Sequence, residues 1–185
     1  MTLDHLDYEA DPVLFPTKQV DLSFANGVPF ELSLAEIYGI LPHRGDKLLL
    51  DSVVGSSDGV VGYLTVRNDH CEGHVIGNEP IFRGVDVLEM AAQLLGMYTF
   101  IVFPDLRGKM CILKSGCLES APFSATIGDK ISIVLDRDSV KKHTVRDTEI
   151  ISVESLYARR SDQRVVGRVS VVLSVWDATL AQSKD

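Results

Sequence analysis

The stretch Cys71 to Phe100, CEGHVIGNEPIFRGVDVLEMAAQLLGMYTF, decides how the rest of the chain must be organised. It begins as a glycine-containing loop that carries His74 and becomes an apolar run with Glu89 near its start. Apolar side chains fall on nearly every face of the helix that this run predicts, which is typical of a helix buried inside a protein. Since a glutamate is rarely buried without a partner, Glu89, one turn before Gln93, calls for an explanation.

The composition is that of an ordinary globular protein of 185 residues, with 45% hydrophobic and 24% charged residues. This length suits one domain, with or without an extension. A net charge of −8 argues against nucleic acid as the main partner, because phosphate contacts need clustered Lys and Arg. Three cysteines without framework spacing argue against a disulfide scaffold.

The N-terminal residues are acidic and lack the basic and then apolar pattern of a signal peptide. Charged residues interrupt every apolar run before it reaches the length of a membrane span. We therefore expect no membrane association and a cytoplasmic location.

Two local signals predict the structure before the central stretch. Short apolar segments flank Asn26-Gly27, which indicates a β-hairpin over residues 19–32. Ser33, followed three residues later by Glu36, predicts a capping box and a short helix that ends near Gly39. The long central helix should start at Gly84 or Val85 and stop before Pro104.

Six further segments are rich in β-branched and alternating apolar residues and are expected to be strands. They are Lys47 to Val54, Gly59 to Arg67, Lys109 to Cys117, Ile131 to Asp136, Glu149 to Arg159 and Val165 to Trp176. A helix that is apolar all round can be covered if a curved antiparallel sheet wraps it, which is an α+β architecture. We expect residues 1–32 to be an extension, 33–178 the domain and 179–185 a polar tail, with a second copy forming a dimer.

Two segments of the chain resemble one known family. Leu41-Pro42-His43-Arg44 followed by Leu48-Leu49-Leu50-Asp51, and Gly73-His74 through Leu88-Glu89 to Gln93, are similar to motifs of 3-hydroxyacyl-acyl-carrier-protein dehydratases. The resemblance spans about residues 36 to 176, with both motifs in the expected order. It implies the hotdog fold, in which an antiparallel sheet wraps a long helix, and assembly as homodimers or higher even-numbered oligomers.

The resemblance also implies a reaction: dehydration of a 3-hydroxyacyl thioester to the trans-2-enoyl thioester, in fatty acid or related lipid or polyketide biosynthesis. The substrate would be carried on the phosphopantetheine of an acyl carrier protein, and no other cofactor is implied. In the family, the histidine and glutamate of one site come from different subunits.

The residue types at the matching positions suit this chemistry. His74 is the candidate base, because imidazole titrates near neutral pH. Glu89 is the candidate acid, since burial is expected to raise its pKa. The Gly84 N–H, at the helix N-terminus, is a candidate donor to the thioester oxygen, and Gln93 is expected to hydrogen-bond Glu89. Arg83 and Lys109 are candidates for contact with the carrier arm.

Other interpretations remain open. A hotdog thioesterase would release free thiol, and a non-catalytic hotdog protein would bind acyl thioesters. The additional residue before Pro80 favours the latter if it moves His74 away from Glu89. A metal site is disfavoured, because Cys111 and Cys117 lack the paired spacing of zinc ligands. His43 and Arg44 are expected to be structural, with Arg44 against a carboxylate or a subunit interface.

Overall fold

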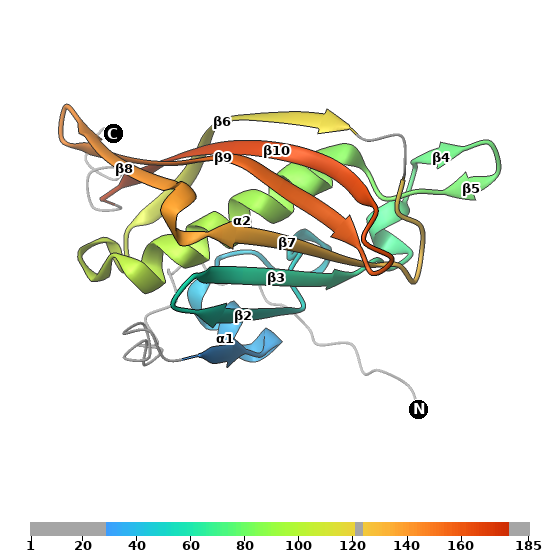
Figure 1. Ribbon diagram of the computed structural model, residues 1–185, viewed down its shortest axis with the longest axis horizontal. Helices are drawn as coiled ribbons and strands as arrows, with labels where there is room; N and C mark the ends of the chain where they lie inside the picture. The colour runs from blue at the N-terminus through green and yellow to red at the C-terminus, as the bar shows by residue number, and fades with distance from the viewer. Residues whose placement is uncertain (1–28, 121–123, 178–185) are drawn as a thin grey trace, which may run out of the picture.

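The computed structural model describes residues 29–120 and 124–177 and has a long helix inside a curved sheet (Figure 1). Helix α2 (Gly84–Val102) is that helix. All ten residues from Ala91 to Phe100 are buried, so neighbouring elements cover every face of this part of the helix. The predicted α+β architecture, a hotdog fold, is therefore confirmed, as are the predicted bounds of the helix.

The sheet is antiparallel at every pairing among the described strands. In spatial order its strands are β1 (Phe30–Leu32), β2 (Ser52–Ser56), β3 (Gly59–Thr65), β7 (Lys130–Asp136), β9 (Thr148–Arg160), β10 (Val165–Trp176) and β6 (Met110–Ser120). β8 (Val140–Val145) pairs with β9 beside this path. A separate two-stranded hairpin consists of β4 (Val75–Ile76) and β5 (Glu79–Pro80).

The core lies between the concave face of this sheet and α2. Strands β10 and β6 make the largest contributions to the contact with the helix. Alternate residues of β7, namely Ile131, Ile133 and Leu135, are fully buried, as the period of two in a strand requires. This arrangement leaves one stripe of α2 facing β6 and the segment that follows α1.

Helix α1 (Leu34–Ile40) begins at the predicted capping box. The carboxylate of Glu36 accepts hydrogen bonds from the backbone N–H of Ser33 and from its hydroxyl, each at 2.7 Å. Four short 3₁₀ helices complete the described elements: Gly45–Lys47, Asp69–Cys71, Pro104–Leu106 and Arg137–Ser139.

Three predictions about the elements need correction. Leu48 to Leu50 are buried, but the strand expected from Lys47 starts only at Ser52. The reason is that the backbone N–H of Leu49 donates to the side chain of Gln93 on α2 instead of to a neighbouring strand. Strand β8 was not expected, since four polar residues separate its two valines. Its turn to β9 uses Arg146 and Asp147, both at positive φ, without the usual glycine.

The third correction concerns the domain boundary at residue 32. β1 pairs with β2 and is an edge strand of the main sheet, so the domain begins before residue 33. The first arm of the predicted hairpin, residues 19–24, lies outside the described residues, as do the tails at 1–15 and 179–185.

By length and composition α2 could cross a membrane, contrary to the sequence-based expectation that no segment could. However, 78% of its most apolar window is buried inside the fold. Its apolar character is therefore explained by its position in the core.

Candidate active site

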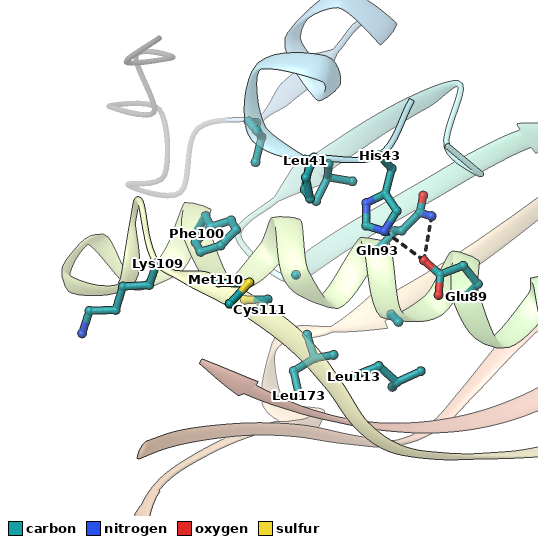
Figure 2. Close-up of a pocket in the computed structure, with 14 residues that line it drawn as sticks. Leu41, His43, Glu89, Gln93, Phe100, Lys109, Met110, Cys111, Leu113 and Leu173 are labelled. Carbon is teal, nitrogen blue, oxygen red and sulfur yellow. Dashed lines mark hydrogen bonds and ion pairs between the residues drawn. The ribbon is translucent and has the colours of Figure 1, made fainter. Parts of the chain in front are cut away.

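Glu89 lies on the stripe of α2 that faces the segment after α1, where it meets His43 (Figure 2). The Nε2 atom of His43 is 3.1 Å from Oε1 of Glu89, and the two side chains are 32% and 37% exposed. Gln93, one turn further along α2, donates from Nε2 to the same carboxylate oxygen at 2.9 Å. Both contacts use Oε1, so Oε2 is the oxygen that a substrate could reach.

Gln93 forms the predicted hydrogen bond to Glu89 and also joins α2 to the segment that carries His43. Its Nε2 donates to the carbonyl of Lys47 at 2.7 Å, and its Oε1 accepts from the backbone N–H of Leu49 at 2.9 Å. Gln93 is only 2% exposed and Leu49 only 3%, so the bond between them is shielded from water. One buried amide therefore holds both the carboxylate and the segment that places its histidine partner.

The expectation that burial would give Glu89 a raised pKa is wrong for the single chain. Burial does act to raise the pKa of Glu89, but the hydrogen bonds from His43 and Gln93, with the charge of His43, lower it below its usual value. Donors that favour the charged form thus outweigh desolvation of this partly exposed carboxylate. Glu89 is consequently ionised in the free chain at neutral pH.

His43 was expected to be structural, yet it lies in the site. Its buried Nδ1 has no hydrogen-bond partner among the described residues. Nε2 is therefore the ring nitrogen through which His43 contacts Glu89. The motif Leu41-Pro42-His43-Arg44 was the signal in the sequence, but nothing local in it indicated contact with a helix about 45 residues later.

Arg44 differs from its expected position against a carboxylate. Its guanidinium donates to the carbonyls of Leu41 at 2.6 Å and His43 at 2.7 Å, and it stacks over the ring of Tyr38 at 5.1 Å. These contacts stabilise the conformation of the turn after α1. Arg44 therefore shapes the backbone that presents His43.

His74 lies at the base of the β4–β5 hairpin and is exposed. Among the described residues, no hydrogen bond or ion pair joins it to Glu89. Its backbone carbonyl accepts from Ile81 at 3.0 Å, which closes the hairpin below the turn at Gly77-Asn78. The additional residue before Pro80 is accommodated within this hairpin, which extends away from its closed base.

Gly84 is the first residue of α2, where backbone N–H groups lack partners within the helix. A Cβ atom there would lie 2.9 Å from a methyl group of Leu118, so the close approach of β6 favours glycine. The position suits the predicted role of the Gly84 N–H as a donor to an oxyanion.

The two candidates for the carrier arm lie at opposite ends of α2. Arg83 precedes the helix and forms a bidentate ion pair with Asp86, at 2.7 and 3.1 Å, which neutralises its charge locally. Lys109 follows the helix and lines the far end of the cavity beside Glu89, with its amine directed away from the cavity (Figure 2). The helix between them is about 28 Å long, so in one chain they do not form one basic patch.

The cavity extends from His43 and Glu89 along α2 to Phe100. Its walls are apolar apart from the two residues of that pair, Gln93 and Lys109. They comprise Ile40, Leu41, Pro42, Ala92, Gly96, Phe100, Met110, Cys111, Leu113 and Leu173. A polar cluster at one end of an apolar channel suits a ligand with a reactive polar group and a hydrocarbon chain.

Comparison with known proteins identifies relatives of the chain. No protein-family model matches it. The chain is 34% identical over 115 residues to a 3-hydroxyacyl-acyl-carrier-protein dehydratase FabZ of Enterococcus faecalis, covering 60% of this chain and 79% of that protein. It is 30% identical over 141 residues to a FabZ of Chloroflexus aggregans, covering 69% and 95%.

Among solved structures, the fold is similar to that of the dehydratase heterocomplex ApeI:P from Xenorhabdus doucetiae. The TM-score is 0.57 at 17% identity, covering 79% of this chain and 95% of that one. This similarity supports the fold, whereas the two curated relatives carry the family assignment. From their identity and coverage we conclude that the chain belongs to the FabZ family of 3-hydroxyacyl-acyl-carrier-protein dehydratases.

Proposed function

We propose that the protein dehydrates a 3-hydroxyacyl thioester, carried by an acyl carrier protein, to the trans-2-enoyl thioester. The observation that carries this proposal is the identity with FabZ dehydratases over most of their length. The position of Glu89 at the polar end of an apolar channel supports it. The pathway is the synthesis of fatty acids or of related lipids or polyketides.

The reaction breaks the C2–H and C3–O bonds, forms the C2=C3 double bond and releases water. His74 takes the proton from C2, while the Gly84 N–H stabilises the negative charge that develops on the thioester oxygen. Glu89 gives a proton to the departing hydroxyl through Oε2. This elimination needs neither an oxidant nor a reductant, so we expect no cofactor other than the phosphopantetheine of the carrier.

We propose that the site is completed by a second copy of the chain. His74 is exposed beside Val75 and Ile76, which are 56% and 63% exposed, and Glu89 faces a different histidine of its own chain. β6 pairs with β10 on one side, and at the other side it is the edge of the described sheet. An edge strand of this length is a ready template for pairing with another chain. A homodimer would cover the apolar hairpin and bring His74 of one subunit to Glu89 of the other.

The low pKa of Glu89 must change before it can act as an acid. Desolvation already acts to raise this pKa, and it is opposed by donors in a site that water still reaches. A partner subunit and an acyl chain would exclude that water and increase the desolvation. We propose that Glu89 acquires its proton on assembly and substrate binding, with His43 and Gln93 fixing Oε1 so that Oε2 faces the hydroxyl.

The partner is an acyl carrier protein, and we propose a cytoplasmic location for the reaction. Acyl carrier proteins are acidic and this chain has a net charge of −8, so a local basic area must offset the repulsion. Of the two candidates, Arg83 lies at the end of α2 nearer Glu89 but is already paired with Asp86, whereas Lys109 lies at the far end of the channel.

The direct test is turnover of a 3-hydroxybutyryl thioester, followed by the ultraviolet absorbance of the conjugated product. His74→Ala and Glu89→Gln are each expected to lower kcat by about 10²–10⁴. His143→Ala and Glu154→Gln, at exposed positions on β8 and β9, are the matched controls. Release of free thiol without enoyl product would instead indicate a thioesterase, and full activity in both site variants would contradict the mechanism.

Mixing the two inactive variants tests the shared site. A mixed dimer of His74→Ala and Glu89→Gln contains one intact site and one doubly substituted site. After unfolding and refolding together, random pairing should restore about a quarter of the wild-type activity. Absence of any recovery, with dimers shown to exchange subunits, would place both residues of a site in one chain.

A further inference from the structure

Gly96 lines the channel without a side chain. Glu89, Ala92, Gln93, Gly96 and Phe100 line the channel from α2. Spacings of three and four residues place them on a single face of the helix, one after another. At Gly96 the opposite walls are Leu41, Cys111 and Leu173.

Neither backbone strain nor close packing requires glycine at position 96. The residue is helical, where glycine is less favourable than alanine. A Cβ atom there would lie 3.9 Å from Leu173 and Leu41 and 4.0 Å from Cys111, which are ordinary contact distances. By contrast, a Cβ atom at Gly62 would lie 2.7 Å from a methyl group of Leu50. Gly62 is needed for packing, whereas the space at Gly96 would admit a methyl group in contact with three apolar walls.

We propose that Gly96 determines the acyl chain length that the enzyme accepts, by leaving the channel open between Glu89 and Phe100. This inference rests on the proposed dehydratase function and names its substrate as a medium or long acyl chain lying along α2. The carbon that bears the hydroxyl lies at Glu89, and the hydrocarbon continues past Gly96 until Phe100 and Met110 close the apolar part of the channel.

The geometry of the helix sets the scale. Gly96 is seven residues beyond Glu89, or about 10 Å along the axis, and Phe100 is about 16 Å beyond it. An extended hydrocarbon advances about 1.3 Å per carbon, given a C–C bond of about 1.5 Å. Counted from C3 at Glu89, a chain therefore reaches Gly96 at roughly C11 and Phe100 at roughly C15. A side chain at position 96 should leave short substrates unaffected and exclude those longer than about C10.

The test compares full-length wild-type protein with Gly96→Leu and Gly96→Ala on 3-hydroxyacyl carrier-protein thioesters of increasing chain length. Gly96→Leu should keep kcat/KM for the C4 substrate within about threefold and lower it for the C12 and C14 substrates by about 10–100-fold. Gly96→Ala, whose methyl group the walls can accept, should show a smaller shift in the same direction. It keeps the proposal testable if Gly96→Leu does not fold.

Gly62→Ala is the control for a defect in folding. It should lower stability through its clash in the core while leaving the ratio of C4 to C12 activity unchanged. A parallel loss at all chain lengths in Gly96→Leu would overturn the proposal, and would instead suit a carrier arm that enters from the Phe100 end. An unchanged profile would overturn it equally.

Binding separates failure of this inference from failure of the proposed function. Saturated C4 and C12 pantetheine thioesters cannot be dehydrated, and their affinities can be measured by calorimetry. Weaker binding of the C12 ligand alone in Gly96→Leu would support the role of Gly96 even if the wild type dehydrated no substrate. Equal affinities of wild type and variant for the C12 ligand would refute it.

Discussion

Replacement of Gln93 by methionine tests whether one buried amide holds the site together. Methionine is unbranched, favours helices and fills a similar space, so the change removes mainly hydrogen bonds. Gln93→Met deprives the Leu49 N–H, the Lys47 carbonyl and the Glu89 carboxylate of their bonds to the side chain.

The magnitude follows from how much water can replace each bond. The N–H belongs to Leu49, which is 3% exposed, so leaving it without a partner should cost about 1–3 kcal/mol. Lys47 and Glu89 are more accessible, and their lost bonds should each cost no more than about 1 kcal/mol. We therefore expect the free energy of unfolding to fall by about 1–5 kcal/mol.

Urea denaturation at a fixed protein concentration measures this loss, because a dimer's stability depends on concentration. The midpoint should fall at an unchanged m value, and kcat should fall as Glu89 loses one of its two donors. Gln93→Glu keeps an acceptor for Leu49 but sets a second carboxyl against the Lys47 carbonyl and Glu89. That raises the pKa of the new carboxyl, so this variant should lose stability as pH rises through the raised value. A loss below about 1 kcal/mol in Gln93→Met would refute the reasoning.

Three further changes probe charge and hydrogen bonding. His43→Ala removes a donor that lowers the pKa of Glu89 while burial still raises it, so this pKa should rise and the Glu89-dependent limb of the pH–rate profile should move to higher pH. Burial and the charge of Arg67 lower the pKa of His70 below 6.5. The contribution of neutral His70 to stability should therefore be complete above pH 6.5 and be lost as the pH falls. His70→Asn should reduce this pH dependence of the free energy of unfolding in urea titrations. Arg107→Met removes donors to two carbonyls near the end of α2, at 2.8 and 3.2 Å, and should lower the melting temperature with little effect on the C4 substrate.

Local signals in the sequence were sufficient for much of the fold. The apolar run and Pro104 gave the bounds of α2, because a helix without a polar face has to be enclosed. The pair Ser33 and Glu36 gave the start of α1, because the capping interaction lies within four residues. Strand β8 was not predictable in the same way, since its four central residues are polar and its register comes from pairing with β9.

The residues of the candidate site were predictable only in part. The sequence alone indicated Glu89 and Gln93, because a carboxylate and an amide one turn apart on an apolar helix are expected to hydrogen-bond to each other. It could not reveal that His43 is the histidine that meets Glu89, since this contact spans 46 positions and depends on Gln93 binding the 47–49 backbone. The shift in the pKa of Glu89 also depends on tertiary structure. Burial, which raises this pKa, can be inferred from the apolar sequence pattern, whereas the hydrogen-bond donors that lower it are brought together only by the fold.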